Sequence, residues 1–155
     1  MENKYSREMP VKVESAKNGF VLNYNVREVS EVELLELWQN SSRAEQEGAV
    51  PATDFVSEHK YVYHPLRIPM GQWKYDGVVN AIIRDKYRTD EMEAITNNMA
   101  AINAVFMQTL VSGGIVEAIK FLRESADAAD TETFREMQEW RAMAKKEAKE
   151  VFRMS

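Results

Sequence analysis

The chain has 155 residues, of which 45% are apolar and none is cysteine, and 20 basic against 25 acidic residues give a net charge of −5. This length fits one domain, and the apolar content is too high for an intrinsically disordered chain. The acidic balance argues against a general binder of nucleic acid or anionic membranes. With no cysteine, thiol catalysis and disulfides are excluded. No signal core or unbroken apolar run near the roughly 20 residues of a membrane span is found, which favours an intracellular protein or one carried in a particle assembled inside a cell.

The N-terminal part has the pattern of a β-hairpin. Val11 and Val13 alternate with polar residues, and residues 20–29 alternate in the same way. Between these stretches lies Asn18-Gly19, a dipeptide typical of tight hairpin turns. The pattern therefore predicts two antiparallel strands joined near Asn18.

Less regular structure is expected after the hairpin. The sequence SEVE matches a capping box and predicts a short helix over residues 31–40, followed by a polar loop to residue 53 with room for a further helical turn. Alternation over residues 58–68 predicts a third strand. Because Pro65 and Pro69 cannot donate to a strand ladder, this should be an edge strand or the end of one.

The C-terminal part predicts about four helices. The second has a clear amphipathic stripe and should end at Gly113-Gly114. The third should direct Val116, Ile119 and Leu122 inwards. The predicted ranges are 76–87, 90–112, 115–125 and 130–151. The sequence thus predicts an α+β protein, with a small antiparallel β segment and a short helix in residues 1–75 and a helical bundle in residues 76–155.

No motif has the spacing of a catalytic or metal site. His59 and His64 would point to opposite faces of an extended strand and so could not share a metal. Ser112 lacks the surround of a nucleophile elbow, and the glycines after it do not form a phosphate-binding loop. We therefore expect no enzymatic activity, no metal and no cofactor.

Aromatic side chains are dense between residues 55 and 75 and interleave with basic residues. Such interleaving can bind single-stranded nucleic acid, but the acidic total favours packing or a protein interface. A second candidate surface is the exposed side of the last helix. The candidate contact residues are Tyr61, Tyr63, Trp73, Trp140 and Arg141.

Two stretches together carry a resemblance. They are YDGVVNAIIRDKYRTDEMEAITNN at residues 75–98 and FREMQEWRAMAK at residues 134–145. The C-terminal part with these motifs resembles small uncharacterised proteins of tailed-phage and prophage structural-gene clusters. The resemblance implies a virion-associated or assembly protein without enzymatic activity, and it carries no functional residue across.

The leading hypothesis is a non-enzymatic structural or assembly protein that works through protein–protein contacts. Its partners would be further copies of itself or other virion or assembly proteins, with no role for nucleic acid or a membrane. It would lie in the cytoplasm of the host cell or in the virion. The alternative is a small acidic regulatory module, such as an inhibitor or an antitoxin, that binds a host protein.

Overall fold

The computed structural model describes residues 1–40, 51–124 and 128–153. The chain forms two compact units, of which the first joins residues 1–81 to residues 147–155 and the second is residues 82–146. A four-stranded antiparallel sheet precedes a mainly helical part with about four helices, which confirms the predicted α+β class. The unit boundary thus follows residue 81, a few residues after the expected change of character at residue 75.

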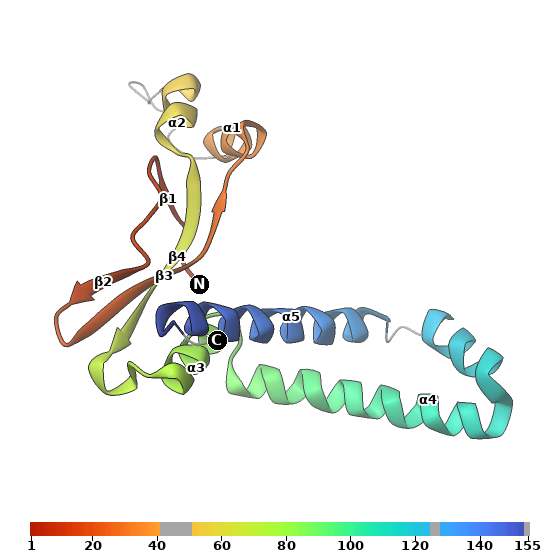
Figure 1. The fold of residues 1–155 in the computed structure, drawn as a ribbon. Helices are drawn as coiled ribbons and strands as arrows, with labels where there is room; N and C mark the ends of the chain where they lie inside the picture. Colours follow the sequence, from red (N-terminus) through yellow and green to blue (C-terminus); the bar gives the residue numbers. More distant parts are fainter. Residues whose placement is uncertain (41–50, 125–127, 154–155) are drawn as a thin grey trace. The chain divides into compact units, whose positions relative to one another are not determined.

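The sheet lies in the first unit. Its strands are β1 (Lys4–Ser6), β2 (Val13–Ala16), β3 (Gly19–Glu28) and β4 (Tyr61–Pro69). They follow the order β1-β4-β3-β2, and each pair is antiparallel (Figure 1). Leu22, Tyr24 and Ile68 are fully buried, so the centre of β3 and the end of β4 contribute the core of this sheet.

The predicted hairpin forms, with β2 and β3 joined across Lys17 and Asn18. Asn18 has a φ of 62°, a left-handed conformation that asparagine adopts more readily than most residues. Gly19 is the first residue of β3 and lies opposite Pro69 of β4. A Cβ atom at Gly19 would lie 2.3 Å from the carbonyl oxygen of Ile68. Glycine is therefore required here by the close approach of two strands.

The third predicted strand forms as β4, but it lies inside the sheet. β1 pairs only with Tyr61, Val62 and Tyr63, the first three residues of β4. Pro65 and Pro69 follow, where β3 is the one strand that pairs with β4 among the described residues. The expectation of an edge strand is therefore wrong for β4 as a whole. The prolines lie in its second half, where a missing N–H interrupts no second ladder.

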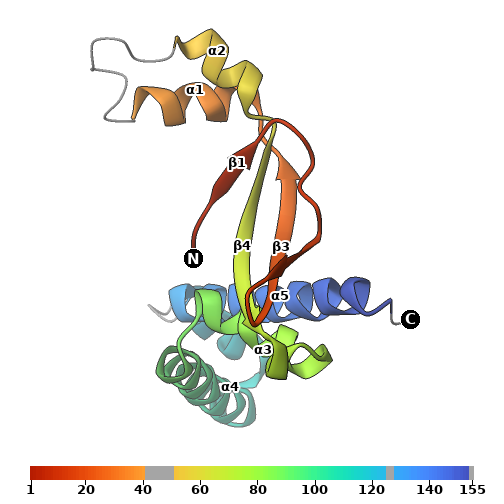
Figure 2. The same ribbon diagram turned by 90° about the vertical axis from the view of Figure 1, so that its left-hand side faces the viewer.

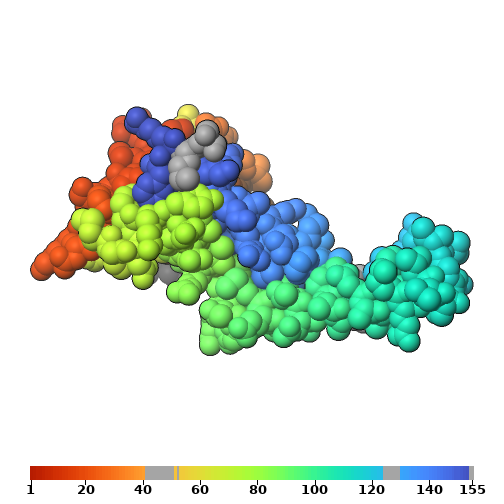
Figure 3. Space-filling view, turned by 60° about the horizontal axis from the view of Figure 1, so that its bottom comes forward, coloured from red at the N-terminus to blue at the C-terminus, as the bar shows by residue number. Residues whose placement is uncertain are grey.

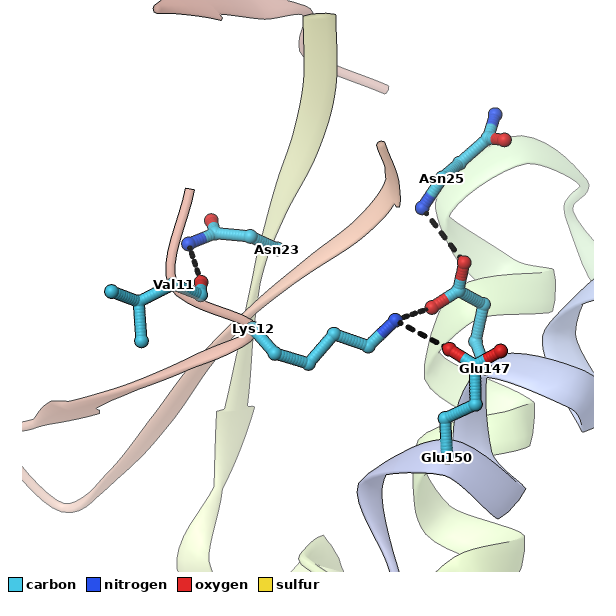
Figure 4. Close-up of polar contacts among 6 residues, drawn as sticks. All are labelled: Val11, Lys12, Asn23, Asn25, Glu147 and Glu150. Atoms are coloured by element: carbon cyan, nitrogen blue, oxygen red, sulfur yellow. Dashed lines mark hydrogen bonds and ion pairs between the residues drawn. The ribbon is translucent and has the colours of Figure 1, made fainter. Parts of the chain in front are cut away.

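A β-bulge interrupts the pairing of β3 with β4 between Tyr24 and Arg27. At the bulge Asn25 has a φ of 51°, and its backbone N–H donates to Oε1 of Glu147 at 3.1 Å (Figure 4). The other carboxylate oxygen of Glu147 forms an ion pair with Lys12. One largely buried carboxylate thus binds the bulge, the segment before β2 and the C-terminal residues of the first unit together.

Asn23 attaches the same segment to the middle of β3. Its backbone N–H donates to the carbonyl oxygen of Lys12 at 2.9 Å, and its side-chain Nδ2 donates to that of Val11 at 2.7 Å (Figure 4). Asn23 is only 2% exposed, so these bonds satisfy groups that water cannot reach. They hold Lys12 where its ammonium group meets Glu147.

Two short helices, α1 (Glu31–Gln39) and α2 (Ala52–Glu58), lie at one end of the strands (Figure 2). The predicted N-cap forms, because Oγ of Ser30 accepts from the N–H of Glu33 at 3.3 Å, whereas the carboxylate of Glu33, the other half of a capping box, accepts from Arg27. Val29, Leu34 and Val62 form the buried core beneath the helices.

The α2 helix goes beyond the prediction, which allowed one further helical turn before residue 53 but no helix continuing to Glu58. It begins after Pro51 without a side-chain cap, so the usual start signal is missing. The sequence instead predicted a polar loop to residue 53, and residues 41–50 of that loop lie outside the described part of the chain. Phe55 and Val56 of α2 pack against the core beneath the helices, which explains why this short segment is helical.

An ion pair supports the start of α1. The guanidinium group of Arg27 donates to both carboxylate oxygens of Glu33, at 3.1 and 2.8 Å. This hydrogen bonding favours the charged form and lowers the pKa of Glu33 below its ordinary value. The contribution is therefore present at neutral pH and is lost as the pH falls through that lowered pKa.

The helices after residue 69 appear in the predicted order. They are the short 3-10 helix η1 (Met70–Gln72), α3 (Tyr75–Lys86), α4 (Thr89–Glu124) and α5 (Ala128–Val151). Gly114 has a φ of 79° and a ψ of 178°, so α4 consists of two helical segments that meet at the predicted break. Within the second unit, α4 and α5 run alongside each other in opposite directions (Figure 1).

We predict that Gly19→Ala lowers the free energy of unfolding by about 1–3 kcal/mol, because the added methyl group overpacks the contact with β4. Gly71→Ala is the matched control, since nothing lies within 4 Å of its added Cβ atom. Urea unfolding measures both. Equal stabilities of the two variants would contradict the close approach.

We predict that Glu147→Ala costs about 1–3 kcal/mol of unfolding free energy, because it leaves the N–H of Asn25 without its acceptor and leaves Lys12 only its exposed partner Glu150. Glu150→Ala is the control. Its side chain is 52% exposed and lies 3.3 Å from Lys12, so we expect a loss below about 1 kcal/mol. Thermal unfolding followed by circular dichroism separates the two, and an equal loss would show that the bulge does not depend on Glu147.

Candidate interaction surface

Three of the predicted contact residues lie in the first unit. By strand alternation Tyr61 and Tyr63 point to one face of β4, and Tyr63 is only 6% exposed. Trp73 packs against the rings of Phe20 and Phe152, at centroid distances of 4.4 and 5.7 Å. Phe20 pairs with Ile68, on the other face of the sheet. The three aromatic residues therefore do not gather on one exposed patch, and their role in an interface stays a prediction.

The other two lie on α5 in the second unit. Nε1 of Trp140 donates to the carbonyl oxygen of Ile82 at 3.1 Å, and the ammonium group of Lys86 lies 4.5 Å from the indole centroid. Trp140 is thus half-buried within the unit, whereas Arg141 is exposed. A contact role for either residue stays a prediction.

The predicted apolar stripe forms the inner side of α4. Ile102 is 5% exposed, and the other members are half-buried. Those members are Met92, Ile95, Met99, Phe106 and Leu110. On the neighbouring α5, Met137 and Ala144 are buried. This inner side accounts for the amphipathic pattern on which the helix was predicted.

The opposite side of α4 is apolar as well, and it is exposed. The 23 residues from Ala94 to Val116 contain no charged side chain. Met107 is 55% exposed and Val111 is 86% exposed, and Ala100 and Ala104 are exposed too. In the space-filling view α4, green to teal, is open along its length (Figure 3). A helix exposing large apolar side chains over such a length has the composition of a contact surface.

The segment after the break adds to this surface, contrary to expectation. Val116, Ile119 and Leu122 were predicted to point inwards, but they are 73%, 41% and 37% exposed. Ala118 is the buried residue of the segment. The side of this segment that is buried is therefore the one that carries the small Ala118, and the larger apolar side chains lie on its exposed side. Ile115, Val116, Ile119 and Leu122 are called the tip cluster below.

One helix in the described part of the chain, Thr89–Arg123, is long and apolar enough to cross a membrane, judged by length and composition alone. The search for an unbroken apolar run missed it, because amide side chains such as Asn103 and Gln108 interrupt the run. Counting charges instead of apolar residues would have revealed the segment. Only 6% of its most apolar stretch is buried, and the remainder is half-buried or exposed.

The exposed surface of the neighbouring helix α5 is charged, unlike that of α4. Arg135 donates to the carboxylates of Glu132 and Glu139 on the same helix face. The hydrogen bond from Arg135 lowers the pKa of Glu132, so both partners are charged at neutral pH. Charged pairs of this kind keep a helix face in water. In the second unit the charged surface of α5 therefore contrasts with the uncharged, exposed side of α4.

The described residues contain no group of three or more histidine, cysteine, aspartate or glutamate side chains that could hold a metal ion. Each histidine contacts a backbone carbonyl oxygen. Nδ1 of His59 lies 2.7 Å from the carbonyl oxygen of Phe55, and Nδ1 of His64 lies 2.9 Å from the carbonyl oxygen of Glu2. Comparison of the chain with protein-family models, with curated proteins and with solved structures found no match.

We predict that Trp140→Phe lowers the free energy of unfolding by about 0.5–1.5 kcal/mol, because it removes the indole donor to Ile82 and keeps an aromatic ring. Arg141→Gln, at the adjacent exposed position, should change stability by less than about 0.5 kcal/mol. Chemical denaturation and the mass in solution should be measured together. If Trp140→Phe weakens association and leaves stability unchanged, Trp140 acts at an interface and not in the packing of the unit.

Proposed function

We propose that this protein is a non-enzymatic structural or assembly subunit of the phage type, which acts through protein–protein contacts made by the exposed apolar side of α4. The observation that carries the proposal is the uncharged stretch from Ala94 to Val116, whose outward side chains are exposed. The resemblance of the C-terminal part to phage structural-cluster proteins supports the same class. The proposal places the chain in the host cytoplasm before assembly and in the assembled particle afterwards.

The energetic argument is the cost of leaving this surface in water. Burial of one valine, isoleucine or methionine side chain contributes about 1.5–3 kcal/mol. Val111, Val116 and Ile115 are 86%, 73% and 63% exposed, so a partner that covers them gains several such contributions. Monomeric proteins seldom expose contiguous apolar patches of more than a few hundred Å². A subunit that is covered after assembly has a reason to expose one.

Val111→Glu tests the proposal. The carboxylate lies within the proposed contact surface, where burial without a partner charge is costly, so we expect association to weaken at least roughly tenfold. The measurement is the absolute mass in solution by light scattering on a sizing column, over a hundredfold range of concentration.

Val32→Glu is the matched control, because Val32 is a 66% exposed valine on the charged helix α1. It should leave the mass unchanged. Equal masses for the chain and both variants, all above the monomer, would place the contact elsewhere than α4. A strict monomer across the whole range would contradict self-assembly and favour the alternative of an acidic regulatory module.

A further inference from the structure

The outer side of α4 has a regular spacing. Asn97, Ala100, Ala104, Met107 and Val111 follow one another at intervals of three, four, three and four residues, and all five are exposed. We call these five residues the outer seam. This is the spacing of alternating a and d positions in a coiled coil. The inner stripe occupies the other side of the helix, so the outer seam is free of the packing within the unit.

We propose that the outer seam pairs in parallel and in register with the same seam of a second copy of this chain. The inference rests on the proposed function and adds the identity of the partner, the orientation and the contacting residues. Three observations select a second copy over other occupants.

The first observation is the distribution of charge. The chain has a net charge of −5, and a net charge of one sign opposes the approach of a second copy. The positions that flank the outer seam are Thr96, Ala101, Asn103, Gln108 and Leu110, and none of them is charged. In coiled coils these flanking positions normally carry the charges that select or reject a partner. From Thr96 to Leu110, two identical helices can therefore approach without like-charge repulsion along these flanking positions.

The second observation is Asn97. Its exposed amide occupies an a position, where asparagine is known to set register and the number of chains. In a parallel, in-register pair the two Asn97 side chains face each other, and each amide can donate to the other. In an antiparallel pair a positions face d positions, so Asn97 would face an apolar residue or glycine and lose its partner. The amide therefore favours the parallel arrangement.

The third observation is the tip cluster. In a parallel pair the two Gly114 breaks lie at the same level, so the two tip clusters come to the same end of the pair. Ile115 is 63% exposed and Ile119 is 41% exposed, and both gain a neighbouring apolar surface there. The seam also has alanine at two positions, and small side chains allow the helices to approach closely.

A lipid bilayer explains the same surface less well. Asn97, Asn98, Asn103 and Gln108 all lie within the uncharged stretch, and amides in hydrocarbon need partners on other helices. Gly114 also interrupts the helix inside this stretch. Irregular backbone that faces lipid leaves polar groups unsatisfied, which the bilayer does not tolerate. Lipid is therefore the competing outcome that the test must recognise.

The experiment is disulfide cross-linking, which is clean because the chain has no cysteine of its own. Ala104→Cys places one thiol at the centre of the seam, where a parallel pair brings two Cα atoms within the 4.4–6.8 Å that a disulfide spans. Asn98→Cys is the matched control, an exposed α4 position on a different side of the helix. After mild oxidation we expect at least roughly tenfold more covalent dimer from Ala104→Cys than from Asn98→Cys. Equal yields from the two variants would overturn the proposal.

Two further experiments distinguish antiparallel pairing and lipid binding from the proposed parallel pair. A mixture of Ala100→Cys and Ala104→Cys that cross-links while Ala104→Cys alone does not would show antiparallel pairing and overturn the orientation. Vesicles of phosphatidylcholine and phosphatidylglycerol are the probe for lipid. If they shield the thiol of Ala104→Cys from maleimide while the chain stays monomeric, lipid is the occupant and the proposal fails.

The mass of the unchanged chain distinguishes this inference from the proposed function. A discrete oligomer without a cross-link at position 104 would overturn the seam and leave assembly standing, whereas a strict monomer would overturn both. Asn97→Leu is an independent test of whether Asn97 lies in the contact. It should raise the association constant and admit other chain numbers or orientations, because the polar a position is lost. Unchanged association would show that Asn97 does not lie in the contact.

Discussion

The carboxylate of Glu147 is the constraint on which the architecture of the first unit depends. The bulge at Asn25 takes a backbone N–H out of the ladder between β3 and β4, and a buried N–H without an acceptor destabilises a fold. Glu147 accepts it, and its other oxygen meets Lys12 before β2. Glu147 is more than a hundred positions away from both residues in the chain, so the N–H at the bulge gains its acceptor only when the C-terminal residues have folded onto the sheet. The first unit is consequently built from both ends of the sequence.

The sequence predicts those elements whose signal is local. The capping residue Ser30, the turn residue Asn18 and the break at Gly114 each act through their own backbone neighbours, and each lies where its type predicts. The interior position of β4 depends on β1, a three-residue strand too short to leave a pattern. The bulge at Asn25 depends on Glu147, which no local rule connects with it. Such long-range causes explain why the topology was less predictable than the elements.

The candidate surface was missed for a different reason. The amphipathic stripe of α4 correctly predicts which side of the helix faces inwards, since Ile102 is buried. The stripe describes only one side of the helix, whereas all sides are uncharged from Ala94 to Val116. The sequence instead placed the candidate contacts mainly on aromatic residues. Two of these, Trp73 and Trp140, contact residues of their own units. The absence of charge over six turns of helix is a pattern that neither a search for aromatic residues nor a search for one apolar stripe detects.

The distance and the angle between the outer seam and the tip cluster depend on the number of residues that precede Gly114 in α4. Each residue before the break adds about 1.5 Å of helix and a rotation of about 100°. An insertion of a single residue would therefore move the tip cluster out of line with the outer seam, although it would lengthen the helix very little. Seven inserted residues would shift the tip by about two turns and bring it back nearly in phase. If the outer seam and the tip cluster act together as proposed, an insertion in α4 keeps them in line only when its length is close to a multiple of seven residues.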